Sequence, residues 1–320
     1  MGGVSDGGTD SLTMLFSDIL EQKAKIIAPE FKQLFLDAIN NQTHDGDLLL
    51  IKVNGAYNPE VYKWTNFPNE NPYRIGSGPE GHSDYAHYKF INQYRSTNIS
   101  DIPYPEYLKR FEFSEDRIKE ISLLEDAEGL SIQSEMLIYL KIWEADLFIK
   151  KLYQIANLIN GVEYDWHFRI KGYNRETKES TGTRENIIRT KIRDRLKVQY
   201  PGIGNALKNA YKTQLRNAIA HSSYFLIGRY IHLTNHDADD PYAQIKVLSF
   251  DEWNSLFHDT MVIYNQLIGF SNWINNFYSR VAMDNNGVVQ IRISRKYPKE
   301  EVTYSMLRYR SEFNDWYPDR

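Results

Sequence analysis

Residues 215–222 read Leu-Arg-Asn-Ala-Ile-Ala-His-Ser, and the predicted fold and function are both built around this stretch. Four residues separate Arg216 from His221, and polar Asn217 follows the arginine. A guanidinium is a permanent cation whose planar fork fits phosphate oxygens. An imidazole can accept or release a proton near neutral pH. Together the two groups can stabilise charge on a phosphorus and move a proton, so they can cleave a phosphodiester without a metal ion.

A helix and two strands are predicted on either side of this stretch. The helix runs from Ile203 into the motif, and on its wheel Arg216 and His221 lie on opposite flanks of the apolar face. We therefore expect a site at a surface or a subunit boundary. The segments 224–234 and 243–250 alternate and are rich in β-branched and aromatic residues, which predicts two strands joined by a polar loop.

Apolar residues at three- and four-residue steps predict further long helices. One helix covers residues 131–160 and ends at Asn160-Gly161, because glycine commonly terminates helices. A polar linker at 172–182 leads to a basic helix at 184–199. Asp251 is predicted to cap a helix from Glu252 to about Tyr278. A turn at 285–287 and a strand at 288–294 follow.

The N-terminal part is less regular. We expect a disordered leader at residues 1–10, a helix from Ser11 that Pro29 interrupts, and a short buried strand at 48–53. Breakers fill residues 54–104, with a helix near 85–94. A helical stretch opens at Pro105 and is expected to end near Ala127, so Glu128-Gly129 is predicted as a domain boundary.

The Arg-x4-His spacing, with a polar residue after the arginine, resembles the signature of the HEPN superfamily. The resemblance implies a mainly α fold, a HEPN-like helical bundle with a small inserted β-hairpin. We place this bundle at residues 130–283. A mixed α/β N-terminal region of unknown role at 11–129 precedes it, and a basic-aromatic tail at 284–320 follows.

The resemblance also implies a function, that of a metal-independent endoribonuclease without a cofactor. The ribose 2'-hydroxyl attacks the adjacent phosphorus and leaves a 2',3'-cyclic phosphate. His221 is then the general base or acid, Arg216 holds the phosphoryl oxygens, and Asn217 orients His221. Two-fold dimers of the family unite two motifs over one cleft, so a homodimer with a composite active site is expected. Bacterial proteins of this kind are often toxins or anti-phage effectors.

A basic run beside the motif is a candidate RNA-binding surface. Residues 184–197 hold six cations and only two acidic residues, Glu185 and Asp194. The RNA contacts expected among the cations are Arg189, Lys191, Arg193 and Arg195. The run is either a face that follows phosphates or a solvated helix face. Ser222 and Tyr224 are further candidates because they adjoin His221.

Three alternatives stay open. A HEPN-like bundle can act as a non-catalytic RNA-binding or dimerisation module. An antitoxin or sensor partner can control the protein, with Tyr224 as the place for a modification. Glu135, Glu144 and Asp146 either polarise a histidine or form the solvent side of a helix. A metal site is not expected at His232, His236 and Asp237, nor around His82 and His87, because too few further ligands are nearby.

Composition sets the outer limits. The 320-residue chain is 42% hydrophobic and 25% charged, with a net charge of −4, so any nucleic-acid surface must be local. The absence of cysteine excludes disulfides, thiolate catalysis and cysteine-based zinc sites. No signal peptide and no membrane-spanning apolar run are predicted, and we expect a cytoplasmic protein.

Overall fold

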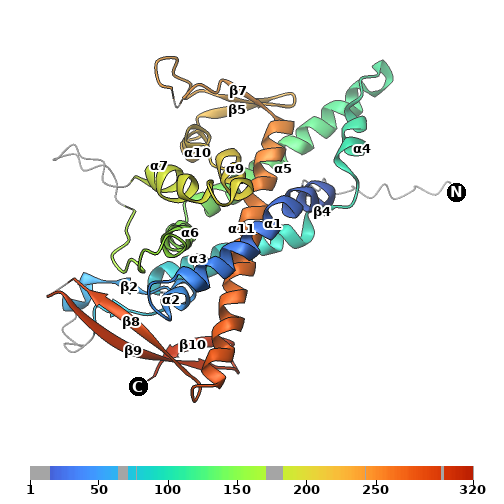
Figure 1. Cartoon of the computed structure of the whole chain (residues 1–320). Helices are drawn as coiled ribbons and strands as arrows, with labels where there is room; N and C mark the ends of the chain where they lie inside the picture. Colours follow the sequence, from blue (N-terminus) through green and yellow to red (C-terminus); the bar gives the residue numbers. More distant parts are fainter. Residues whose placement is uncertain are drawn as a thin grey trace.

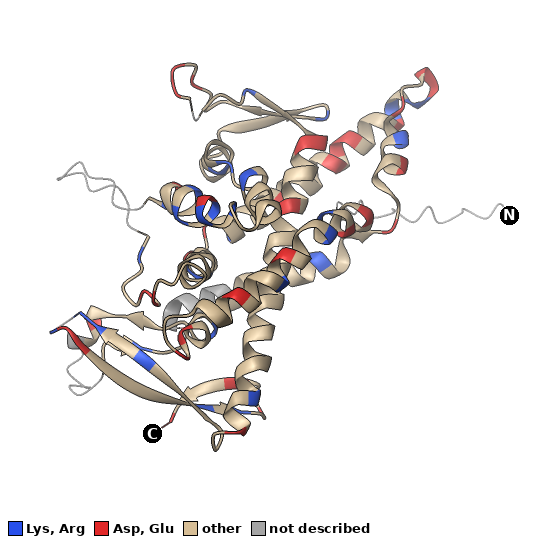
Figure 2. Ribbon diagram, viewed as in Figure 1, with Lys and Arg blue, Asp and Glu red and all other residues tan. Residues whose placement is uncertain are grey.

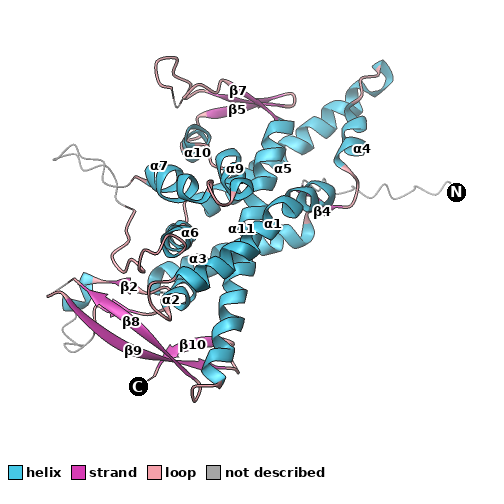
Figure 3. Cartoon of the chain, in the orientation of Figure 1, coloured by secondary structure: helices cyan, strands magenta, loops and turns pink. Residues whose placement is uncertain are grey.

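The computed structural model describes residues 15–63, 71–76, 78–170, 183–241, 243–296 and 299–319. The chain is mainly helical, as predicted, and carries small sheets (Figure 3). The predicted leader at 1–10 and the polar linker at 172–182 lie outside the described residues.

Helix α11 (Phe250–Met283) crosses the molecule between its two three-stranded sheets (Figure 1). It packs against α1, α2, α5 and α9. Buried aromatic and aliphatic residues recur along most of the helix, so these contacts stabilise it over its whole length. The predicted helix is confirmed, but its cap is Ser249 instead of Asp251. The Ser249 side chain accepts from the Glu252 amide, and the Glu252 carboxylate accepts from the Ser249 amide.

The N-terminal segment departs from prediction in two places. Helix α1 (Ser17–Asn41) continues through Pro29. Residues 48–53 are not a strand but most of helix α2 (Asp47–Val53), which is buried apart from Lys52. A short apolar run that is buried on every side has no periodicity to separate strand from helix. Gly46 and Asn54, both with left-handed φ, bound it.

Helices α3 to α6 follow. The helix expected near 85–94 is confirmed as part of α3 (Gly78–Thr97). The helix opening near Pro105 is broken: α4 (Tyr104–Leu108) and short 3-10 turns precede α5 (Ile118–Trp143). The predicted boundary at Glu128-Gly129 therefore lies inside α5. The helix predicted over 131–160 is two helices, because the chain turns at Glu144-Ala145 before α6 (Asp146–Leu158). The stop at Gly161 is confirmed by its φ of 67°.

The basic segment and the motif form a run of short helices. The predicted basic helix is α7 (Arg184–Asn186), a π-helical segment η4 (Ile187–Arg193) and α8 (Asp194–Leu196). The helix predicted to run from Ile203 into the motif is divided into α9 (Pro201–Ala210) and α10 (Thr213–Ala220).

Two antiparallel sheets flank α11. The predicted strand pair after the motif is a three-stranded sheet, because Gly228-Arg229 turns the chain between β5 (Tyr224–Ile227) and β6 (Tyr230–Leu233) before β7 (Val247–Ser249). The strand predicted at 288–294 is confirmed as β8 (Val288–Arg295), which pairs with β9 (Glu301–Arg310), and β10 (Asp315–Pro318) completes that sheet.

Four two-residue strands form two small ladders in the N-terminal part. β1 pairs with β4 in parallel, and β2 pairs with β3 in antiparallel fashion. Their bounds are β1 (Leu15–Phe16), β2 (Ala56–Tyr57), β3 (Tyr73–Arg74) and β4 (Ile99–Ser100), and a 3-10 turn η1 (Pro59–Lys63) follows β2.

One hydrophobic cluster runs through the whole fold, from Leu15 to Trp316. It encloses ionisable groups whose charged forms are disfavoured by burial. Glu135 of α5 accepts from Trp253 Nε1 at 2.6 Å and Tyr94 Oη at 3.0 Å, and burial raises its pKa to about 8. This carboxyl joins α3, α5 and α11.

His258 of α11 is a second buried polar link. Its Nε2 accepts the Phe16 backbone N–H at 2.9 Å, so Nδ1 carries the proton and donates to the Asn254 carbonyl at 2.7 Å. Burial lowers the pKa of His258 from 6.5 to about 4. The folded chain therefore holds a neutral imidazole over a range in which the unfolded chain binds a proton.

We predict that His258 makes stability fall with acidity. The stability is fully present above pH 6.5 and is lost as the pH falls through 4, by roughly 3 kcal/mol in all. The raised pKa of Glu135 acts in the opposite sense, because its contribution declines as the pH rises through 8. Denaturant unfolding of wild type and His258→Gln across pH 4–8 isolates the histidine. The variant should show a shallower acid decline, and parallel curves would contradict the assignment.

Candidate functional site

A buried hydroxyl from α5 determines where the motif helix begins. Tyr139 Oη donates to the Ala210 carbonyl at 3.1 Å and accepts the Lys212 backbone N–H at 3.2 Å. These two backbone groups flank the break between α9 and α10, where Tyr211 and Lys212 are extended. The hydroxyl satisfies groups that the broken helix leaves unpaired. The register of α10, and with it the direction of Arg216, is therefore set by a side chain more than seventy positions earlier in the chain.

Arg216 is held by two side chains. Its Nη1 lies 2.8 Å from Glu144 Oε1, and its Nη2 donates to Asn217 Oδ1. Its side chain is only 19% exposed. The buried Nε has no hydrogen-bond partner within the part of the chain that the structure describes. The guanidinium is therefore fixed in direction and keeps one donor unused.

The Glu144 carboxylate is shared between the motif and the basic segment. Arg184 Nε lies 3.4 Å from Glu144 Oε2, and Arg184 Nη2 lies 2.7 Å from Asp146 Oδ1. Glu144 is the C-cap of α5, Arg184 opens α7 and Arg216 belongs to α10. Two guanidinium groups from separate elements are thus brought to one carboxylate.

His221 stands at the C-terminal end of α10 with an exposed side chain. The backbone there forms a Schellman motif: Ser223 N–H donates to the Ala218 carbonyl and Ser222 N–H to the Ile219 carbonyl. Ser222 takes the left-handed position, at a φ of 54°, that glycine usually fills. Among the described residues, the imidazole of His221 makes no hydrogen bond, and it is open to solvent.

Arg216 and His221 point in different directions on α10. Five steps of the helix turn the side-chain direction by roughly 500°, which leaves the two about 140° apart. The prediction that they occupy opposite flanks rests on this same helical geometry. One chain alone therefore presents the cation and the imidazole on two sides of the same short helix.

Asn217 has a different role from the one predicted. Its side-chain Oδ1 accepts from Arg216, while only its backbone carbonyl accepts from His221, at 3.0 Å. The carboxamide thus positions the guanidinium and not the imidazole. The spacing of four residues between Asn217 and His221 predicted that the two side chains are neighbours. It did not predict that the Asn217 amide would bind Arg216 instead.

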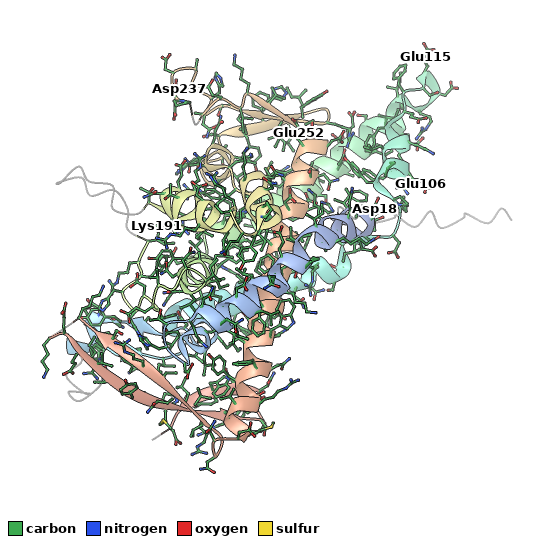
Figure 4. The ribbon with its side chains drawn as sticks, in the orientation of Figure 1. Asp18, Glu106, Glu115, Lys191, Asp237 and Glu252 are labelled. Atoms are coloured by element: carbon green, nitrogen blue, oxygen red, sulfur yellow. The ribbon has the colours of Figure 1, made fainter. Side chains whose placement is uncertain are left out.

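The basic candidates divide into two groups. Burial lowers the pKa of the Lys212 ammonium, and the nearby cations Lys208, Arg189 and Arg193 lower it further. Arg189 and Arg193 therefore lie close to Lys212. Arg195 instead donates to Asn157 of α6 at 2.6 Å. Figure 2 shows Lys and Arg side by side on α7, η4 and α9, and Figure 4 labels Lys191 on η4.

Sequence reasoning missed Lys208 and Lys212, which supply cations on the motif side of this surface. Their only signal was proximity to the motif in the sequence. Arg189 and Arg193 are also paired with Glu185 and Asp194, at 2.8 and 3.0 Å. The carboxylates of Glu185 and Asp194 therefore neutralise part of the positive charge of this surface.

The other candidates lie outside this cluster. Ser222 is exposed beside His221, and Tyr224 is half-buried at the start of β5. The His232 ring stacks on Phe225, with centroids 4.8 Å apart. Glu135 is buried in the core. Within the described ranges, no group of three or more His, Asp or Glu side chains is arranged to hold a metal ion.

A scan against protein-family models and searches of curated proteins and of solved structures found no match to this chain. Over the residues that the structure describes, no helix combines the length and the apolar character needed to cross a bilayer.

We predict that Ser222→Gly is neutral or stabilises the fold by up to about 1 kcal/mol. A non-glycine residue in the left-handed region costs about 1–2 kcal/mol, and the greater entropy of unfolded glycine offsets part of the gain. Denaturant unfolding measures the change. Ser223→Gly is the matched control and should be neutral or destabilising, since Ser223 has no positive φ. A loss of stability in Ser222→Gly alone would contradict the assignment of strain.

Proposed function

We propose that this protein is a metal-independent endoribonuclease of the HEPN-like kind. The observation that carries the proposal is the geometry of α10: a fixed Arg216 lies on the helix, and five positions later its C-cap, His221, is exposed and makes no hydrogen bond to a described residue. Arg184 stands beside Arg216 and adds a second cation for the phosphate. The chemistry needs no cofactor.

In the proposed reaction the ribose 2'-oxygen attacks the neighbouring phosphorus. An imidazole takes the 2'-hydroxyl proton while the new oxygen–phosphorus bond forms. The bond from phosphorus to the 5'-oxygen breaks, and that oxygen takes a proton from a second acid. The products are a 2',3'-cyclic phosphate and a 5'-hydroxyl. Arg216 stabilises the negative charge on the non-bridging oxygens in the transition state.

The proposed active unit is a homodimer. The divergence of Arg216 and His221 on one helix supports a site in which the arginine of one subunit and the partner's His221 face the same phosphate. Such a composite cleft also supplies the two imidazoles that the reaction uses, one as base and one as acid. The biological role we propose is a cytoplasmic toxin or anti-phage effector, controlled by a partner that masks or modifies it, with Tyr224 as a candidate for modification.

The Arg216 contacts favour a second candidate function. A guanidinium that is bound to Glu144 and Asn217 can be a structural link between α5 and α10. The protein would then be a non-catalytic module that binds RNA or dimerises. The two functions differ in whether RNA is cut. A module that binds RNA shares RNA binding with the nuclease, and a module that only dimerises does not.

We predict that the purified protein cuts labelled single-stranded RNA in the presence of EDTA and leaves a 2'-deoxy analogue intact. His221→Ala should reduce cutting by about 10²- to 10⁴-fold, because the proton-transfer group is lost. Binding of the uncut DNA and the thermal midpoint should stay unchanged, because His221 is exposed. Gel analysis of the fragments measures the cutting, and their ends should carry cyclic phosphate.

His236→Ala is the matched control, since His236 lies in the loop between β6 and β7. It should leave cutting at the wild-type rate. Cleavage that EDTA abolishes, or that persists in His221→Ala, would overturn the nuclease mechanism. RNA binding without cleavage would establish the module instead.

A further inference from the structure

The Glu144 carboxylate is exposed and contacts two largely buried cations, Arg184 and Arg216. The Glu144 side chain is 41% exposed, whereas the side chains of Arg216 and Arg184 are only 19% and 16% exposed. Each guanidinium contacts a different oxygen of the same carboxylate, at 2.8 Å for Arg216 and 3.4 Å for Arg184. The carboxylate therefore separates the two cations from the solvent.

Two guanidinium groups around one oxyanion form the arrangement that recognises phosphate. The buried Nε of Arg216 adds a donor that no described residue uses. Lys212, which precedes Arg216 by four positions in the chain, has further cations nearby, namely Lys208 of α9 and Arg189 and Arg193 of η4. The Glu144 carboxylate, between Arg184 and Arg216, occupies the position that a phosphate group would take.

The Glu144 side chain can leave this position without a change of fold. Glu144 lies at the turn between α5 and α6, and its side chain is the most exposed of the three. Partly exposed ion pairs are weak, so a strongly charged polyanion can replace the carboxylate. Asp146 still contacts Arg184 at 2.7 Å and keeps it in place while Glu144 turns away.

We infer that Arg184 and Arg216 form one subsite for a nucleic-acid backbone phosphate, and that Glu144 fills this subsite in the free chain. An incoming phosphate displaces the Glu144 carboxylate. The inference deepens the proposed nuclease function and rests on it for the class of ligand. It assigns Arg184 to the binding surface and gives Glu144 the role of an internal competitor.

The test measures binding of a fluorescent single-stranded oligodeoxynucleotide, which the proposed mechanism cannot cut. Glu144→Gln keeps the shape of the side chain and removes its charge. Its dissociation constant should be roughly three- to tenfold lower than that of the wild type, because no competing ion pair has to break. Glu144→Ala should change binding in the same direction. Thermal unfolding checks that both variants are folded.

A double-mutant cycle separates competition from a general change in charge. In an Arg216→Gln background, Glu144→Gln should tighten binding much less, because the subsite is already incomplete. Glu163→Gln removes the same charge at a site paired with Arg292 of β8, and should change binding less than twofold. Unchanged binding by Glu144→Gln, a full effect without Arg216, or no DNA binding by any variant would each overturn the inference.

The outcome is independent of cleavage. Tighter DNA binding by Glu144→Gln in a protein that cuts no RNA would support the phosphate subsite and reject the nuclease. RNA cleavage with unchanged binding by Glu144→Gln would reject the subsite alone.

Discussion

The contact between Glu144 and Arg216 fixes the candidate site, because it joins the end of α5 to α10 and draws Arg184 of α7 to the same carboxylate. Ion pairs of this exposure contribute about 1 kcal/mol or less. They therefore set the direction of the guanidinium groups while other interactions hold the fold. A weak link of this kind suits a binding surface, because a ligand can replace it.

The stronger constraint lies one layer deeper. Tyr139 and Trp143 are fully buried on α5, and the Tyr139 hydroxyl holds both ends of the break between α9 and α10. Trp143 packs on Tyr211 of that break, with ring centroids 5.2 Å apart. The buried contacts of Tyr139 and Trp143 determine where α10 starts. The ion pairs at the surface then set the direction of the Arg216 side chain on that helix.

Sequence patterns predicted the elements whose causes are local. The apolar stripe of α11, the glycine end at Gly161 and the strand β8 each follow from spacing within a short segment. Sequence patterns failed to predict helix ends that depend on a residue far away in the chain. The break before Thr213 depends on Tyr139, and the end of α5 at Trp143 could not be seen in a continuous apolar periodicity. Residues 48–53 are buried apart from Lys52, so nothing in their order distinguished helix from strand.

The same division explains the candidate site. Residue types identified Arg216 and His221 as chemically capable, and the helical wheel placed them on different flanks. The partners of Arg216 come from other elements, so neither the Glu144 contact nor the preference of Asn217 for the arginine could be read from the motif. One member of the pair is held by its own chain, and the other is free in solvent. A catalytic arrangement then requires that a ligand release the arginine and that a second subunit supply a facing imidazole, whereas a structural arrangement requires neither.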